Sequence, residues 1–153
     1  MSPQTEKTIR RLGFAGLVPF VLLALLMWLV HSDLLPFVSI ALAAYATTVV
    51  SFLGGIHWGM GFIQGTRTET PDAPSNIEPG FHFIWGVMPS LVAWLALMMP
   101  AYAALPLLGL VLVACYAVDR KTYPPAGLAH WLPMRLQLTS VATLSCVIGA
   151  AAV

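Results

Sequence analysis

Two histidines inside otherwise apolar stretches carry the most versatile chemistry in this sequence. His57 is followed by Trp58, and His82 precedes Trp85 by one helical turn. Two facing histidines can act as the axial ligands of a b-type haem, whereas a metal site usually needs three or four ligands. Because no cysteine or carboxylate lies at ligand spacing near either histidine, we expect no metal site and no cofactor, with haem b held by His57 and His82 as an alternative. The simpler interpretation is that each histidine hydrogen-bonds a backbone carbonyl or lies among lipid headgroups.

Further charged residues flank one short polar loop. Asp119 and Arg120 precede it and Arg135 follows it. An arginine guanidinium binds phosphate or carboxylate through two parallel hydrogen bonds. Arg120 and Arg135 are therefore candidates for binding a lipid headgroup or an acidic loop of a partner. Alternatively, Asp119 forms an internal ion pair with one of the arginines, or these residues only anchor the helix ends at the membrane surface.

Small residues gather around His57. Spacings of four between small residues let two helix backbones approach closely. We expect this face to pack against another helix of the chain, with a dimer interface and a glycine-lined ligand groove as alternatives. The candidates for helix packing are Ser51, Gly54, Gly55, Gly59, Gly61 and Gly65.

Composition decides which elements can position these residues. Of the 153 residues, 59% are hydrophobic and 8% are charged, and the mean hydropathy is +0.85. Soluble domains average about 25% charged residues. The composition therefore excludes a soluble enzyme and a disordered regulator, and the net charge of +1 is too small to indicate a nucleic-acid partner. The expected partner is a lipid bilayer.

The apolar stretches predict an all-α polytopic membrane protein with one domain over residues 1–153. About 20 apolar residues in a helix span the roughly 30 Å hydrocarbon core of a bilayer. Pro19, Pro89 and Pro106 should kink the helices that contain them, and Cys115 and Cys146 should be small core residues. Five stretches reach or approach the required length: about 12–30, 36–62, 81–99, 102–118 and 133–153.

Positive charges give these five spans an orientation. If the N-terminus is cytoplasmic, all seven Lys and Arg residues fall on the cytoplasmic side, as the positive-inside rule requires. We therefore predict a cytoplasmic N-terminus and a C-terminus on the opposite side. The polar segment 66–76 is predicted to be a flexible connector on the cytoplasmic side.

Several sequence blocks carry a family resemblance. They are LGFAGLVPF at 12–20, SFLGGIHWG at 51–59, WGVMPSLVAW at 85–94, Asp119-Arg120 and LPMRLQLT at 132–139. Together they resemble the domain of unknown function 3429 family, small polytopic membrane proteins that include mitochondrial transmembrane protein 69. The resemblance implies a multi-pass protein of a bacterial cytoplasmic (inner) membrane or a mitochondrial one, and it brings no catalytic residue with it.

Three functions fit these observations. The leading hypothesis is a non-enzymatic accessory, assembly or structural subunit that acts through helix–helix contacts with a larger membrane complex or with its own copies. The second is a binding protein for a lipid, quinone or b-type haem at the inner leaflet. The third is an oligomeric channel or carrier, which is weakened because no predicted span carries a central charge. The binding candidates are His57, Trp58, His82, Trp85, Arg120 and Arg135.

Overall fold

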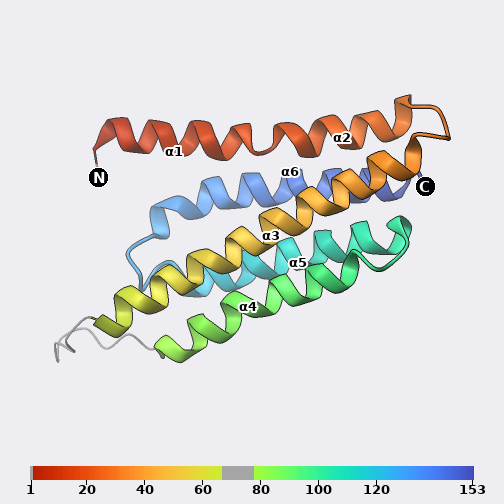
Figure 1. The fold of residues 1–153 in the computed structure, drawn as a ribbon. Coiled ribbons are helices and arrows are strands. Elements are labelled where there is room, and N and C mark those ends of the chain that lie inside the picture. The colour runs from red at the N-terminus through yellow and green to blue at the C-terminus, as the bar shows by residue number, and fades with distance from the viewer. Residues whose placement is uncertain (1, 67–77) are drawn as a thin grey trace.

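A computed structural model describes residues 2–66 and 78–153. These residues form α-helices and one 3-10 turn, with no strand among them (Figure 1). The elements are α1 (Pro3–Ala15), α2 (Val18–Leu29), α3 (Leu35–Thr66), α4 (Pro79–Ala96), α5 (Ala101–Thr122), η1 (Ala129–Trp131) and α6 (Leu132–Ala150). The helices overlap all five predicted stretches, and the all-α prediction is confirmed for the described residues.

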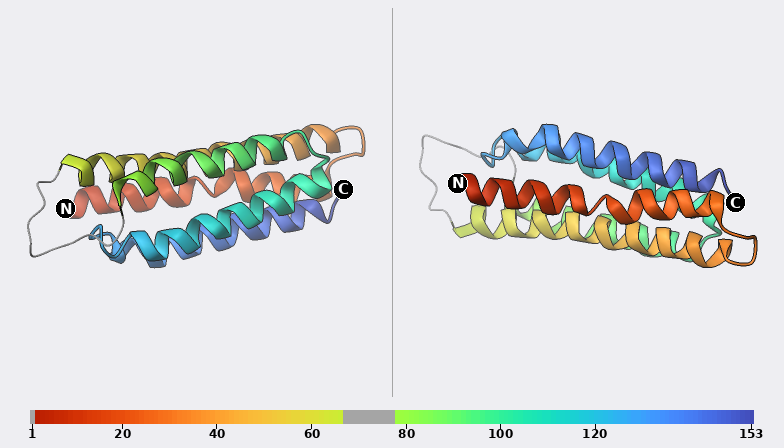
Figure 2. Two further views of the ribbon diagram at one scale, coloured as in Figure 1. Left: turned by 90° about the horizontal axis from the view of Figure 1, so that it is seen from below. Right: turned by 90° about the horizontal axis from the view of Figure 1, so that it is seen from above.

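The helices lie side by side in an elongated bundle (Figures 1 and 2). The N-terminus, the end of α3, the start of α4 and the connection from α5 to α6 lie at one end. The C-terminus and the α2–α3 and α4–α5 connections lie at the other end. We call the first the basic end, because it carries the Lys and Arg residues of the described chain: Lys7, Arg10, Arg11, Arg120, Lys121 and Arg135.

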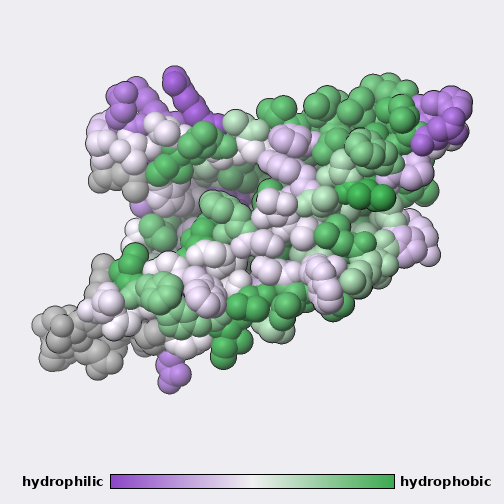
Figure 3. Space-filling model, in the orientation of Figure 1, coloured by the Kyte–Doolittle hydropathy of each residue, from purple (hydrophilic) through white to green (hydrophobic). Residues whose placement is uncertain are grey.

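In the part of the chain that the structure describes, three helical segments are long and apolar enough to cross a membrane: α1 and α2 taken together over Pro3–Leu29, α3, and α5. Gly80–Ala96 of α4 is a shorter apolar helix. Large apolar side chains are exposed around the bundle, including Leu29, Phe37 and Ile40, which are 78%, 74% and 65% exposed. In Figure 3 the hydrophilic residues gather toward the ends of the visible face, and the middle is mostly apolar. The surface is therefore that of a membrane protein.

The first predicted span is divided in two. Helix α1 begins earlier than predicted, at Pro3, where the Ser2 hydroxyl accepts a hydrogen bond from Thr5 N at 3.2 Å. It ends at Ala15 because Pro19 has no N–H to donate to the Ala15 carbonyl. The predicted kink at Pro19 is thus confirmed as a break between α1 and α2. Helices α4 and α5 continue past Pro89 and Pro106.

The core lies where α3, α5 and α6 meet. Leu42, Val50, Leu105, Leu108 and Leu112 are almost completely buried there. Cys115 and Cys146 are buried and unpaired, which confirms their prediction as core residues. Helix α3 packs mainly on α4, and α5 mainly on α6. These two pairs hold the polar residues described next.

Candidate functional site

Four helices each contribute one polar residue to a buried cluster near the basic end. The Nδ1 atoms of His57 on α3 and His82 on α4 are 3.1 Å apart. His57 Nε2 is 3.1 Å from Asp119 Oδ1 on α5. Asp119 Oδ2 accepts hydrogen bonds from Arg135 Nε at 2.9 Å and from its terminal nitrogen Nη2 at 2.6 Å. We call these four residues the polar cluster.

For an ionised Asp119 and two neutral histidines, the hydrogen bonds determine where each proton lies. An ionised Asp119 only accepts hydrogen bonds, so His57 Nε2 must carry a proton. In a neutral His57 the Nδ1 atom is then an acceptor, so His82 Nδ1 donates to it. His82 Nε2 is left as an acceptor; it is buried and has no partner among the described residues. In this state Arg135 and Asp119 carry opposite charges, both histidines are neutral, and the cluster has no net charge.

Burial makes the polar cluster sensitive to the loss of any member. His57, His82 and Asp119 are at most 3% exposed, and the Arg135 side chain is 12% exposed. Removing one partner of a buried ion pair typically costs about 3–5 kcal/mol, because the other charge is left unpaired. The cluster therefore fixes how α3, α4, α5 and α6 pack at this end.

This arrangement corrects the simplest prediction for the histidines. They bond to each other and to Asp119 instead of to backbone carbonyls. A haem does not fit between them, because a direct 3.1 Å hydrogen bond leaves no room for a porphyrin and its iron. Among the described residues, no group of three or more His, Cys, Asp or Glu is placed to hold a metal ion.

The two tryptophans predicted beside the histidines have different environments. Trp85 meets His57 edge to face, with ring centroids 6.5 Å apart, and stacks on Phe81. Trp58 donates a hydrogen bond from Nε1 to the Phe83 carbonyl at 3.1 Å. Trp85 thus borders the polar cluster, whereas Trp58 joins α3 to α4.

The two arginines also separate. Arg135 is bound by Asp119, and Arg120 is exposed outside the polar cluster. The internal ion pair of Asp119 with Arg135 is present, and Arg120 is not part of it. On α6, the Thr143 hydroxyl also bonds across helices, because it donates to the Gly109 carbonyl of α5 at 3.3 Å.

Only some of the predicted glycines lie at helix contacts. A Cβ atom on Gly54 would collide with the Gly86 carbonyl of α4, and one on Gly61 would press on His82 and Phe83. A Cβ atom on Gly55, Gly59 or Gly65 would meet nothing within 4 Å. Within residues 2–66 and 78–153, these last three glycines do not pack against another helix, in contrast to the prediction. Ser51 is half-buried.

A groove runs beside the polar cluster between α1, α2, α3 and α6. It has a volume of about 730 Å³, and Figure 3 shows a hollow between α1 and α3 toward the basic end. Its walls are mostly apolar, with Leu12, Phe20, Phe52 and Leu138 among the lining residues. Ligand sites usually enclose about 300–1,000 Å³, so this groove is large enough for one chain of an amphiphile.

Among the described residues, one charged residue lines this groove, and it lies at the start of α6 near the basic end. Arg135 is the one charged residue among those that line it, and Tyr123 and Thr139 line it too. Arg135 donates from Nε and Nη2 to Asp119, and the Tyr123 hydroxyl is a further hydrogen-bond partner of its guanidinium. Of its five N–H groups, the remaining ones are left for a ligand. Burial, reinforced by Asp119, raises the pKa of Tyr123 to about 12, so its hydroxyl stays protonated.

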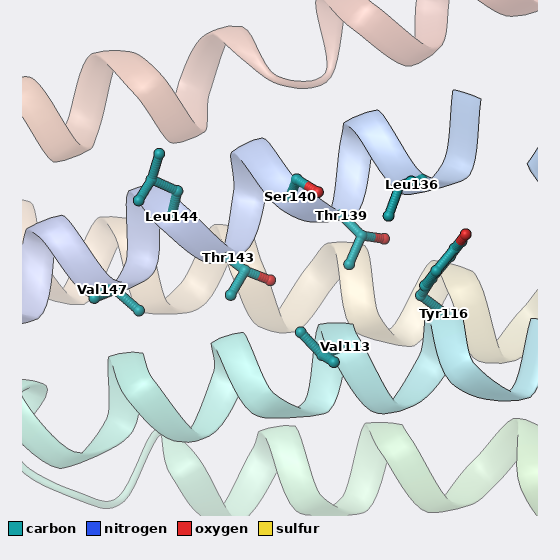
Figure 4. A pocket seen from close by; sticks show the side chains of 8 residues that line it. All are labelled: Val113, Tyr116, Leu136, Thr139, Ser140, Thr143, Leu144 and Val147. Atoms are coloured by element: carbon teal, nitrogen blue, oxygen red, sulfur yellow. The ribbon is translucent and has the colours of Figure 1, made fainter. Parts of the chain in front are cut away.

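Thr139 is the second polar feature of the groove. Its hydroxyl is buried and has no partner among the described residues, although the residue as a whole is 5% exposed. Thr139 also lines a smaller hollow of about 360 Å³ between α5 and α6, where Tyr116 and Val113 face it (Figure 4). A buried hydroxyl without a partner costs about 1–3 kcal/mol, so Thr139 is a natural place for a bound polar group.

Comparison with known proteins adds the family. Residues 5–151 match the model of a family described as "Protein of unknown function (DUF3429)". The chain belongs to this family. It is 34% identical over 141 residues to Transmembrane protein 69 of Xenopus tropicalis. The match covers 89% of this chain and 51% of that protein, so the chain spans about half the length of this relative. No solved structure matches.

Sequence reasoning identified part of this site within the family fold. The sequence indicates His57, His82, Asp119 and Arg135 as candidates. Apart from a possible ion pair of Asp119 with an arginine, it does not predict their mutual contacts. Gly86 was missed, although its spacing of seven from the fully buried Ala93 marks a small face of α4. The groove was missed because it depends on the tilt of helices that are distant in sequence. The predicted connector at 66–76 lies almost entirely outside the described residues.

Proposed function

We propose that this protein is a non-enzymatic, five-span membrane protein that binds a phospholipid, with one acyl chain in the groove and the headgroup at Arg135. The observation that carries this proposal is an apolar groove whose one charged lining residue is an arginine with a side chain 12% exposed. The apolar walls suit an acyl chain, and the arginine suits a phosphate. A quinone would use the same walls, and it is an alternative outcome of the test.

The proposed topology places this groove in the cytoplasmic leaflet of a bacterial inner membrane. The basic end then faces the cytoplasm, as the positive-inside rule requires. Basic pockets between helices on this side commonly bind anionic headgroups. A reporter fused to the C-terminus should be active only outside the cytoplasm, and cytoplasmic activity would overturn the five-span arrangement.

Lipid retention tests the binding proposal directly. Native mass spectrometry of gently solubilised protein should show one retained phospholipid per chain. Thr48→Trp places a large side chain in the groove and should remove the lipid. Ile40→Trp adds the same side chain to the exposed surface of α3 outside the groove and should not. Equal lipid retention by the two variants would contradict the proposal, and a retained quinone would change the ligand.

A second candidate function is that of an accessory subunit that docks on another membrane protein or on a second copy. The open glycine face at Gly55 and Gly59 favours it, because helices pack closely at such faces in lipid. Gly55→Leu should then release a partner or dissociate a dimer in native mass spectrometry, without lowering the thermal stability of the monomer. An unchanged complex would remove this candidate.

A further inference from the structure

The His57–His82 pair lies where it can balance the charge of a lipid bound at Arg135. This inference rests on the proposed function of the groove. We propose that the groove selects anionic phospholipids and that binding of one such lipid is coupled to uptake of one proton by the His57–His82 pair.

The first step is the charge balance. With no ligand bound and both histidines in their neutral form, the charges of Arg135 and Asp119 cancel. An anionic headgroup at the remaining N–H groups of Arg135 brings the site to a net charge of −1. Uncompensated charge is costly in a buried, low-dielectric site. One added proton restores neutrality without breaking the Asp119–Arg135 ion pair.

The second step is where that proton goes. His82 Nε2 is an acceptor with no partner among the described residues, at the start of α4 near the basic end. A proton from water that binds there makes His82 an imidazolium. His82 can then pass its Nδ1 proton to His57 Nδ1 across the 3.1 Å hydrogen bond. The charge moves to His57, whose Nε2–H already donates to Asp119.

Other titratable and charged groups near the His57–His82 pair could also take up or release a proton. Besides His57 on α3 and His82 on α4, Asp119 and Cys115 face the cluster from α5, and Arg135 faces it from α6. Tyr123, after α5, borders Arg135 and keeps its proton because its pKa is about 12. On α1, Lys7, Arg10 and Arg11 are exposed. The two histidines are thus the groups suited to take up a proton near neutral pH.

The sign of the coupling follows directly. The complex with an anionic lipid holds one more proton than the free protein, so binding must tighten as the pH falls. For one proton the limiting slope is about tenfold in affinity per pH unit. A zwitterionic lipid adds no net charge and should show a flat profile.

The experiment uses Trp131, which lines the groove, as the reporter. Purified protein is titrated with phosphatidylglycerol or phosphatidylcholine that carries brominated acyl chains, which quench nearby tryptophans. The titrations run from about pH 8 to about pH 5.5, on both sides of the ordinary histidine pKa of about 6.5. Trp131→Phe identifies the part of the quenching that comes from the groove.

We expect phosphatidylglycerol to bind several-fold more tightly at the acidic end of the range and phosphatidylcholine to change little. The double variant His57→Gln/His82→Gln can keep the hydrogen bonds through its amides but cannot take up a proton. It should bind phosphatidylglycerol without pH dependence. A flat wild-type profile, or an unchanged slope in the double variant, would overturn the coupling.

A measurement on the wild type keeps the test independent of how the double variant folds. Binding heats for phosphatidylglycerol in buffers of different ionisation enthalpy report the protons taken up, and the expected number lies between zero and one, rising toward one inside the titration range. No uptake throughout would contradict the inference. Absence of Trp131 quenching by either lipid would instead contradict the proposed groove function itself, so the two failures are distinguishable.

Discussion

Helices α3 and α4 meet backbone to backbone, whereas α1 has no buried residue and leaves a groove beside it. We call the α3–α4 contact the closed side and the groove beside α1 the open side. Helix α1 itself carries Glu6, Lys7, Arg10 and Arg11. The closed side has glycines at the helix crossing and a polar cluster that joins four helices. The open side has the break between α1 and α2 and a hydrogen bond that the Tyr45 hydroxyl donates to the Gly16 carbonyl at 2.8 Å. The difference shows that hydropathy alone places helices in the membrane, while a few polar and small residues decide which of them close together.

The largest effect should come from breaking the closed side at its ion pair. Arg135→Ala should lower the free energy of unfolding by about 3–5 kcal/mol, because Asp119 is left charged and buried. Adding Asp119→Asn should restore part of the loss by removing the orphaned charge. Arg120→Ala is the matched control on an exposed residue and should change stability by less than about 0.5 kcal/mol. Thermal unfolding in detergent measures all four proteins, and equal losses for the two arginines would contradict a closed polar cluster.

Two adjacent glycines give the next largest effect. Gly54→Ala should cost about 1–3 kcal/mol, because its Cβ would collide with the Gly86 carbonyl and push α3 and α4 apart. Gly55→Ala should be neutral or stabilising by up to about 1 kcal/mol, since its Cβ meets open space and alanine favours the helix. The pair isolates close packing from helix propensity. The same thermal measurement should separate them, and similar melting temperatures would show that α3 and α4 are not in close contact.

These glycines also show what the sequence could and could not predict. Apolar length located the helices, and Pro19 located the break, because both effects act within one segment. Gly54 and Gly55 differ by about 100° around the same helix, so their contacts depend on how α3 is rotated against α4. The contact between His57 and Asp119, 62 positions apart, depends on the packing of several helices. Local sequence patterns therefore locate the helices and their breaks. The contacts between helices depend on how the whole bundle packs.

A smaller loss of stability should appear on the open side when the hydrogen bond of Tyr45 to Gly16 is removed. Tyr45→Phe loses the hydrogen bond to Gly16, worth about 1 kcal/mol, at the break between α1 and α2. Tyr102→Phe is the control, because Tyr102 is 65% exposed. Hydrogen exchange should show faster opening of α1 in Tyr45→Phe while α3 and α4 keep their protection. If α4 loosened as much as α1, the two sides would not be independent.

The smallest effect on stability should come from Thr139 of α6, and Thr143 on the same helix is its comparison. Thr143 donates to Gly109 on the closed α5–α6 contact, so Thr143→Val should cost about 0.5–1.5 kcal/mol. Thr139 is buried without a partner at the groove, so Thr139→Val removes an unsatisfied hydroxyl and should leave delipidated protein equally stable or slightly more stable. With phospholipid present, Thr139→Val should become less stable than the wild type, because the wild-type hydroxyl then has a headgroup to bond. Thr143→Val should show the same loss with and without lipid. Melting temperatures of both variants, with and without added lipid, measure this. A loss at Thr139 in delipidated protein would mean that its hydroxyl already has a partner, and the groove would then offer the headgroup only Arg135 and Tyr123.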